Sequence, residues 1–372
     1  MPESKRITLI LGNGFDLDLG LKTSYKDFWE SKFCPKDYPA PLIFHLNSHW
    51  PNNLEAVKWY DLENELYYYA KNSVSTGRRK DIITESEREF LEIVKPEYIG
   101  FGIYNDYSDQ MNSLLQKRIL VVDPTYIHRY RIPYQEDLLK SPLERDSIAL
   151  ELIKKGLCEY LKQIELPKEE QNTVAYNVLL SLLKTAEKGE FVEIFTFNYT
   201  LVRRLGYVLE EVPVHYMHGR CDDGKVIIGT RDDTEIESDY AFLQKALDPT
   251  FYPPQLVGSL QAADEVIIFG HSIGENDRQY FKAFFKQQTD YSHTKSKDIT
   301  IFTRDHASEV QIKLALQNMT DGNLSTLFGL NRVQIIKSGG LKEDQKRFFD
   351  FLVNHHTDEH FASEVIGKLL YK

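Results

Sequence analysis

The chain has 372 residues, of which 42% are hydrophobic and 27% are charged, a composition typical of a globular protein with a substantial core. Its formal net charge of −11 argues against a general binder of nucleic acid, because affinity for a phosphate backbone depends on clustered Lys and Arg. The 3 cysteines have no paired spacing, which excludes a disulfide framework and a four-cysteine zinc site. Without a stretch of signal-peptide or transmembrane length, we expect a cytoplasmic protein that does not bind a membrane.

The chain opens with an apolar strand at 6–11, and a helical pattern begins at Phe15 and runs to about Phe33. The following region is mainly helical by pattern, because apolar residues recur at helical spacing in three segments, 54–70, 84–95 and 145–164. Between the last two, residues 98–140 lack a clear period and are expected to be irregular.

Short, β-branched strand patterns return in the second half of the chain, at 192–197, 212–217, 225–229, 265–270, 298–303 and 332–337. From residue 265 onward they alternate with helical patterns at 276–288, 306–318 and 342–357. Apolar strands that alternate with helices are typical of a parallel sheet covered on both faces. We therefore predict an α/β fold with a doubly wound, Rossmann-like sheet. Its domain would comprise 1–34 and 186–372, with a helical insertion subdomain at 35–185.

The first strand ends in a glycine turn that consists of Gly12, Asn13, Gly14, Phe15 and Asp16. Such a turn lies at the carboxyl edge of an α/β sheet, where ligands bind, and the N–H groups of the next helix favour an anion. The turn matches neither G-x-G-x-x-G nor the P-loop. Asp16 would cap the helix or bind ribose hydroxyls, and a plain strand-to-helix turn is the alternative.

Two further polar residues follow predicted strands. Asn198 ends the strand 192–197, and its amide can hold a ribose hydroxyl or orient a water molecule, although asparagine is also common in turns. His218 follows the strand 212–217 and precedes Gly219, which would leave space beside a histidine acting as a general base. A structural histidine explains the same pattern, and His215 is the competing candidate.

The stretch 265–281 contains Gly270-His271-Ser272-Ile273-Gly274, which matches the G-x-S-x-G nucleophile elbow of serine hydrolases. Asp305 and then His355 or His356 follow in the chain order that such a triad requires. However, the polar residues from Glu275 to Arg278 predict that the helix starts later than it does in an elbow. A flexible loop that contacts a ligand is therefore the favoured interpretation, and a hydrolase that uses Ser272 is the alternative.

The order of these motifs resembles the AbiH family of bacteriophage abortive-infection proteins, itself similar to the wider sirtuin-like group of NAD-binding folds. The resemblance depends on the segments LILGNGFDLDLGLKTSY, WYDLE, TFNYT, HG and GHSIGENDRQYF. It is concentrated in residues 7–30, 193–230 and 265–285 and covers about a fifth of the chain. The absence of a four-cysteine zinc ribbon and the helical nature of the insertion depart from the sirtuin deacylases, so hydrolysis of NAD is favoured over deacylation.

The resemblance implies an NAD site with a role for each motif. Asn198 would lie beside the nicotinamide ribose, and His218 would act as the base. Asp277 or Asp16 would add negative potential near the developing charge on the sugar. The residues that would bind the dinucleotide are Gly12, Asn13, Gly14, Phe15, Asp16, Gly219, Gly270, His271, Ser272 and Asp277.

The resulting hypothesis is an antiphage NAD glycohydrolase that needs no metal. A non-catalytic NAD or ADP-ribose sensor, or an interaction module, is the alternative from another class. A second copy of the chain, a regulatory protein or a phage protein would bind through the helical insertion.

Overall fold

The computed structural model describes residues 4–49, 61–75, 137, 140–165, 173–200, 212–292, 295–355 and 357–370. Among the helices in these ranges, none combines the length and the apolar character needed to cross a lipid bilayer. The chain forms two compact units. The first contains Met1–Ser24, Leu161–Val226 and Tyr252–Lys372, and the second contains Tyr25–Tyr160 and Ile227–Phe251.

The first unit is built on a six-stranded sheet with the strand order β3-β2-β1-β6-β7-β8, in which every neighbouring pair is parallel. The strands are β1 Arg6–Leu11, β2 Phe191–Thr196, β3 Val214–Tyr216, β6 Glu265–Phe269, β7 Asp298–Thr303 and β8 Arg332–Lys337. In the register of the central strand, Leu9 lies between Ile194 of β2 and Ile267 of β6.

The strand order shows that the sheet is doubly wound. From β1 the chain adds β2 and β3 on one side, and then returns to add β6, β7 and β8 on the other. This is the strand order of the Rossmann fold, in which ligands bind where the winding direction reverses, here between β1 and β6. The predicted Rossmann-like α/β sheet is confirmed, whereas its sirtuin-like character stays a prediction.

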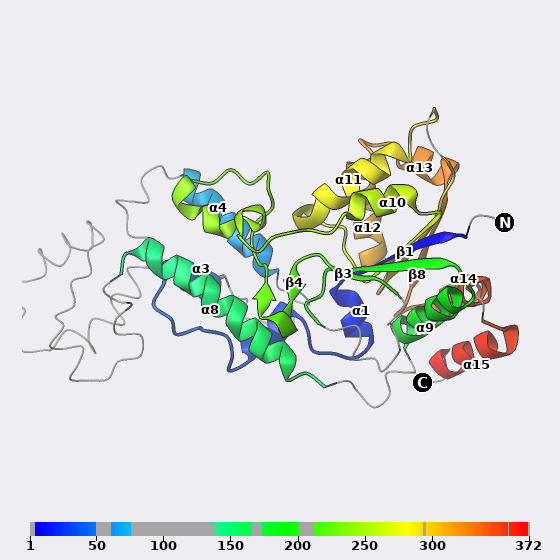
Figure 1. The fold of residues 1–372 in the computed structure, drawn as a ribbon, viewed down its shortest axis with the longest axis horizontal. Helices are drawn as coiled ribbons and strands as arrows, with labels where there is room; N and C mark the ends of the chain where they lie inside the picture. Colours follow the sequence, from blue (N-terminus) through cyan, green and yellow to red (C-terminus); the bar gives the residue numbers. More distant parts are fainter. Residues whose placement is uncertain are drawn as a thin grey trace, which may run out of the picture. The chain divides into compact units, whose positions relative to one another are not determined.

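Helices cover both faces of the sheet, because its parallel strands are apolar on both sides. One face carries α1 Asn13–Asp18, α9 Val174–Glu187, α14 Leu341–Asn354 and α15 Glu359–Leu370 (Figure 1). The other carries α10 Leu256–Ala262, α11 Arg278–Gln287, α12 His306–Met319 and α13 Leu324–Leu330 (Figure 1). The main core cluster lies on the first face, between the side chains of β1 and those of α9, α14 and α15.

Two predicted elements differ from the structure. The single helix predicted from Phe15 to Phe33 is wrong: α1 ends at Asp18, and α2 occupies Tyr25–Glu30. Between them Gly20 takes a left-handed conformation, with φ of 83°, which stops the helix. The predicted strand 225–229 is reduced to β5 Lys225–Val226, which pairs antiparallel with β4 Gly219–Arg220.

The second unit contains four α-helices within the described ranges: α2, α3 Pro41–Ser48, α4 Leu62–Ser75 and most of α8 Pro142–Lys162. Single-turn helices at Ser238–Leu243 and Lys245–Leu247 belong to its second segment. The buried Lys245 side chain donates to Glu63 of α4 at 2.8 Å, so this segment is joined to α4. The predicted helix 84–95, and 98–140 except residues 137 and 140, lie outside the described residues.

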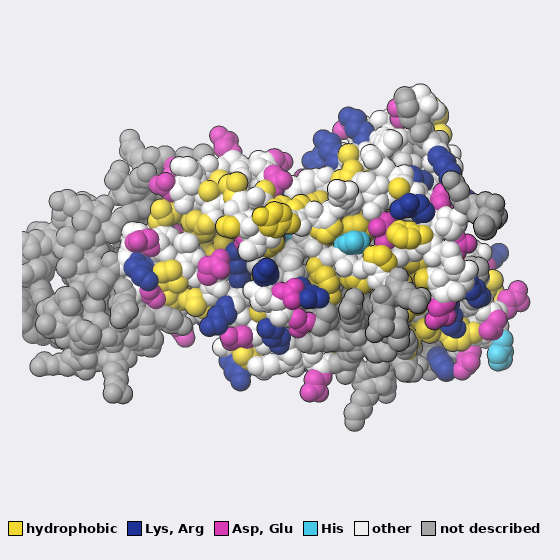
Figure 2. Space-filling view, in the orientation of Figure 1, with side chains coloured by type: hydrophobic (Ala, Val, Ile, Leu, Met, Phe, Trp, Pro, Cys, Tyr) yellow, Lys and Arg dark blue, Asp and Glu magenta, His cyan; other side chains and the backbone are white. Residues whose placement is uncertain are grey.

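The domain boundaries were predicted at 34/35 and 185/186, whereas the compact units divide the chain after Ser24, Tyr160, Val226 and Phe251. α9 belongs to the first unit because its apolar side chains pack against the sheet, and Ile227–Phe251 belongs to the second unit. On the face shown in Figure 2, Lys and Arg side chains of the described residues are interspersed with Asp and Glu.

Candidate functional site

The predicted site residues lie at the carboxyl edge of the sheet, where four neighbouring strands end. The glycine turn follows β1, Asn198 follows β2, His218 follows β3, and Gly270 follows β6. Their strands are adjacent in the order β3-β2-β1-β6, so the turn, the asparagine and the histidine meet at the reversal point of the winding.

The turns after β1 and β6 pack backbone against backbone. Gly12 N–H donates to the Phe269 carbonyl at 2.9 Å, and Gly14 N–H donates to the Gly270 carbonyl at 2.8 Å. A Cβ on Gly12 would lie 2.5 Å from the Cα of His271, and one on Gly14 would lie 2.6 Å from the Cα of Gly270. The glycines are therefore required by the close approach of two loops.

This packing changes the role that the sequence predicts for the glycine turn. The N–H groups of Gly12, Gly14 and Phe15 each donate to a backbone carbonyl, so they are not directed at an anion. Gly12 is the N-cap residue of α1 and no side chain caps this helix, which means that capping by Asp16 is wrong.

The Asn198 side chain joins the turn after β2 to the turn after β1. Its Nδ2 donates to the Gly12 carbonyl and to Asp16 Oδ1, both at 3.0 Å. A flipped amide would place Oδ1 against these two acceptors, so the contacts fix its orientation. Within the described ranges no group donates to Asn198 Oδ1, which is thus directed away from Gly12 and Asp16 as an acceptor.

Asp16 is a buried carboxyl group beneath Asn198, with 4% of its surface exposed. Burial raises its pKa from 3.8 to about 6, against hydrogen bonds from Thr200 and Asn198 that lower it. Thr200 Oγ1 donates to Asp16 Oδ2 at 2.6 Å. Asp16 therefore changes its charge near pH 6, beside the amide that it helps to orient.

A second polar cluster surrounds the Phe197 ring, next to Asn198. The ring centroid of Phe197 lies 5.3 Å from that of His218 and 4.2 Å from that of His271. Asp277, which precedes α11, contacts both histidines: its Oδ1 is 3.5 Å from His218 Nε2 and its Oδ2 is 3.3 Å from His271 Nε2. A single carboxylate thus bridges two buried imidazoles. We call His218, His271 and Asp277 the Asp277 cluster.

The hydrogen bonds of His271 identify its tautomer. The Ile273 N–H donates to His271 Nδ1 at 2.9 Å, so Nδ1 carries a lone pair and the proton is on Nε2, facing Asp277. Both ring nitrogens of His271 are engaged within the protein, which makes it a supporting residue in this cluster. The acceptor carboxylate likewise favours a proton on His218 Nε2.

His215 and His218 differ in their surroundings, although both belong to the β3 region. His215 stacks on Phe195 with centroids 4.6 Å apart, and its Nε2 is 4.0 Å from Glu193 Oε2. Gly219, after His218, has φ of 81°, and a Cβ there would lie 2.2 Å from the Lys225 carbonyl oxygen. Gly219 is thus required by the β4–β5 hairpin, which differs from the predicted role of leaving space for a ligand.

The serine-hydrolase geometry is not formed around Ser272. Ser272 is exposed in an irregular loop, and α11 begins only at Arg278, as the polar residues predict. His355 contacts Glu265 at the start of β6, with Nε2 3.2 Å from Glu265 Oε2, whereas Ser272 follows the end of that strand. Asp305 caps α12 by accepting the Ser308 N–H. A triad of Ser272, Asp305 and His355 is therefore excluded, and His356 lies outside the described residues.

Sequence reasoning missed three supporting residues of this site. Thr200 donates to Asp16, the Phe197 ring contacts the rings of both histidines, and Thr23 Oγ1 donates to Asn13 Oδ1 at 2.6 Å. Phe197 and Thr200 both lie in the segment TFNYT, where the spacing of two from Asn198 to Thr200 was an available signal.

Together, the fold and the site define an α/β protein with Rossmann-like strand order and a buried polar site at the reversal point of its sheet. A family model described as bacteriophage abortive infection AbiH matches residues 8–298, and the chain belongs to this family of phage-defence proteins. The predicted resemblance to AbiH is confirmed, whereas the sirtuin-like grouping stays a prediction. No curated protein and no solved structure matches the chain.

Proposed function

We propose that this AbiH-family protein binds NAD at the carboxyl edge of its sheet and hydrolyses the bond between nicotinamide and ribose. The observation that supports this most is the meeting of Asn198, His218 and the glycine turn at the position where Rossmann-like sheets bind dinucleotides. The chemistry is suited to the site because nicotinamide leaves as a neutral molecule and needs no acid.

Asn198 would act on the nicotinamide ribose through Oδ1. Its two amide hydrogens are occupied by Gly12 and Asp16, and the remaining acceptor can bind a ribose hydroxyl or the attacking water. Because the amide is held from two sides, it needs no reorganisation when the substrate binds.

His218 would accept the proton of the attacking water or of a ribose hydroxyl. Asp277 would hold the imidazole through Nε2, so the proton would be taken by Nδ1, and the carboxylate would stabilise the resulting imidazolium. His271 holds the other oxygen of Asp277 and thereby fixes the direction of that carboxylate.

Asp16 and Asp277 would stabilise the positive charge that develops on the ribose as nicotinamide departs. Asp16 does so only when ionised, and its pKa of about 6 means that it carries a charge at neutral pH. Gly270 and Ser272 would contact the adenosine half of NAD, as the family resemblance implies.

The experiment is an assay of free nicotinamide after the purified full-length protein is incubated with NAD, at several protein concentrations. His218→Ala is expected to reduce release by about 10²–10⁴-fold, the usual contribution of a general base, and to retain NAD binding. His215→Ala is the matched control, because it removes a histidine of β3, three residues before His218, that faces Glu193.

Each outcome of this assay decides between the functions. NAD binding without nicotinamide release by the wild type would favour a nucleotide sensor over a hydrolase. Equal loss of release in His215→Ala and His218→Ala would remove the assigned base. No binding of NAD or ADP-ribose at all would overturn the site itself.

A further inference from the structure

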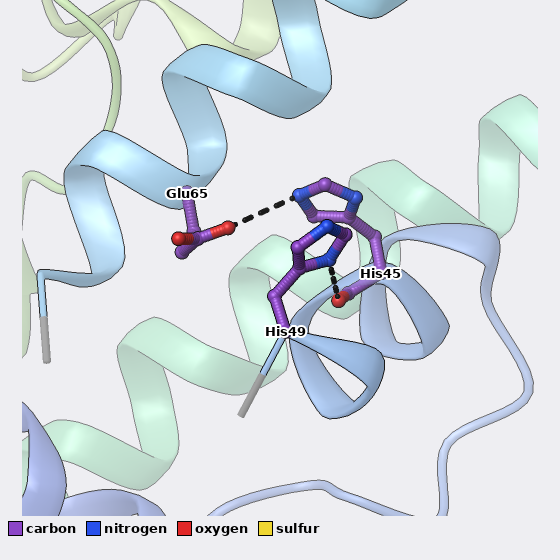
Figure 3. Close-up of side chains that lie close together, drawn as sticks. All are labelled: His45, His49 and Glu65. Carbon is purple, nitrogen blue, oxygen red and sulfur yellow. Dashed lines mark hydrogen bonds and ion pairs between the residues drawn. The ribbon is translucent and has the colours of Figure 1, made fainter. Parts of the chain in front are cut away.

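A second cluster of chemically active side chains lies in the second unit, apart from the residues discussed so far. His45 lies on α3, His49 follows the C-terminal end of that helix, and Glu65 lies on α4, with His45 and Glu65 directed toward each other (Figure 3). One ring nitrogen of each histidine and one carboxylate oxygen lie within 4.8 Å of one another. We call these three residues the Glu65 cluster.

The spacing within this cluster is that of metal ligands. His45 Nε2 and Glu65 Oε2 are 3.4 Å apart, which is longer than a usual hydrogen bond. Two ligands at about 2.1 Å from a tetrahedral zinc ion are separated by about 3.4 Å, so both atoms already stand at the required distance. Glu65 Oε2 is buried and accepts no hydrogen bond among the described residues.

The tautomer of His49 also suits a metal ligand. Its Nδ1 lies 2.8 Å from the His45 carbonyl oxygen, and since a carbonyl only accepts, Nδ1 must carry the proton. The lone pair of the neutral ring is then on Nε2. Metal-binding histidines commonly donate their second N–H to a backbone carbonyl in this way, which fixes the ring and the tautomer.

The helices that carry the ligands are joined by a buried carboxylate of α8. Asp146 accepts the Leu42 N–H, in the first turn of α3, at 2.7 Å, and the Tyr69 hydroxyl of α4 at 2.5 Å. Leu42 is three residues from His45, and Tyr69 is four residues from Glu65. His45 and Glu65 therefore each lie one helical turn from a residue that is hydrogen-bonded to Asp146. His45 and Glu65 are therefore held in place without a metal.

We propose that His45, His49 and Glu65 bind a zinc ion that links α3 to α4. Two imidazoles and one carboxylate are a ligand set that zinc prefers, whereas calcium and magnesium prefer oxygen ligands alone. Three protein ligands leave a fourth position for water. His49 is exposed, so the site is open to solvent on that side. This proposal replaces the sequence prediction that the protein holds no metal.

The test uses untagged, full-length protein that has been stripped with a chelator and dialysed. Zinc chloride is titrated against a chromophoric chelator, and one tightly bound zinc per chain is expected. His49→Ala and the isosteric Glu65→Gln should each weaken zinc binding by at least about 100-fold, the upper range for losing a supporting partner at a metal site.

His306→Ala is the matched control. Its Nδ1 is 3.5 Å from Glu309 Oε2, which gives one histidine beside one carboxylate on α12, and it should bind zinc as the wild type does. Wild-type protein that takes up no zinc would overturn the proposal, as would His49→Ala and Glu65→Gln variants that bind zinc like the wild type. Because His49 is exposed, its removal leaves the packing intact, and circular dichroism checks this.

Discussion

The Asp277 cluster and the Glu65 cluster each place two histidines around one carboxylate, in different units of the chain. In the Asp277 cluster, both carboxylate oxygens face an Nε2 atom, and both histidines are buried. In the Glu65 cluster one oxygen faces one Nε2 atom, and the second histidine is exposed and donates its proton to the backbone. The same residue types therefore form two different kinds of site.

The difference depends on where the imidazole protons point. A carboxylate that faces Nε2 favours a proton on that atom, as it does at His218 and His271. At His45, which faces Glu65 in the same way, the proposed zinc ion would replace that proton. A backbone carbonyl that takes the Nδ1 proton instead leaves Nε2 as a metal ligand. Composition and spacing in the sequence do not reveal this choice, whereas the hydrogen bonds do.

The largest expected effect is that isosteric variants separate the proposed release of nicotinamide from the proposed binding of zinc. Asp277→Asn should lower nicotinamide release by about 10²–10⁴-fold, because the amide no longer stabilises an imidazolium, and it should leave zinc affinity unchanged. Glu65→Gln should weaken zinc binding and leave nicotinamide release unchanged. Both quantities are measured on each variant.

The distinction between the two clusters would be contradicted if either variant changed nicotinamide release and zinc affinity to the same extent. Such a result would mean that the two clusters act as one site or support only folding. Thermal unfolding of both variants separates a loss of fold from a loss of chemistry.

The next effect concerns the close packing of the turns after β1 and β6, which is a feature of the site at the sheet edge and not of the Glu65 cluster. A Cβ on Gly270 would lie 2.3 Å from the Phe15 nitrogen, at φ of 63°, so Gly270→Ala should lower the free energy of unfolding by about 4 kcal/mol. Gly258→Ala, on α10 with open space around it, should be neutral or stabilising by about 1 kcal/mol. Urea unfolding measures both, and equal stability of the two variants would contradict the loop packing.

Asp16 gives the first site a dependence on pH. Its pKa is about 6 in the folded state against 3.8 for the free group, so its favourable contribution is complete below pH 3.8 and is lost as the pH rises through 6. The difference corresponds to about 3 kcal/mol at neutral pH. Relative to the wild type, Asp16→Asn should therefore gain stability between pH 4 and pH 7.

The measurement is urea unfolding of both proteins across this pH range. Asp305→Asn is an informative control, because the pKa of Asp305 is lowered from 3.8 to about 2 by the N–H of Ser308, so its contribution is lost only as the pH falls below 3.8. Its removal should therefore leave the pH dependence between pH 4 and pH 7 nearly unchanged. A stability difference between Asp16→Asn and the wild type that stays constant with pH would contradict the assigned pKa.

The sequence predicted most of the sheet and only part of the site. The strands 6–11, 298–303 and 332–337 agree with the structure to the residue, because buried parallel strands are continuous apolar runs. The end of the helix before Gly20 was not predicted, because an isolated glycine in a helical pattern can adopt either a helical or a left-handed conformation.

The sequence predicted which residues belong to the site, but it did not predict the contacts between them. Asn198 and His218 were predicted at one edge of the sheet because each follows the end of a strand. The contacts of Asp277 with His218 and His271 depend on the conformation of a loop, which the hydrophobic periodicity of the sequence does not predict. The Glu65 cluster was missed for a related reason. His45 and His49 show a spacing of four, whereas Glu65 is brought to them by helix packing.

The smallest expected effect concerns the Glu65 cluster and the carboxylate of Asp146 that supports it. Asp146→Asn removes one of the two acceptors that hold α3 and α4, so it should lower the free energy of unfolding by about 1–3 kcal/mol. Because the ligands lose their preset spacing, zinc affinity should fall by about 10–100-fold, as it does when the support of a metal ligand is lost. Asp305→Ala removes a helix cap of the first unit and should lower stability by about 1 kcal/mol without affecting zinc. If Asp146→Asn is destabilised and still binds zinc like the wild type, the ligands are placed by their own helices and not by the shared carboxylate.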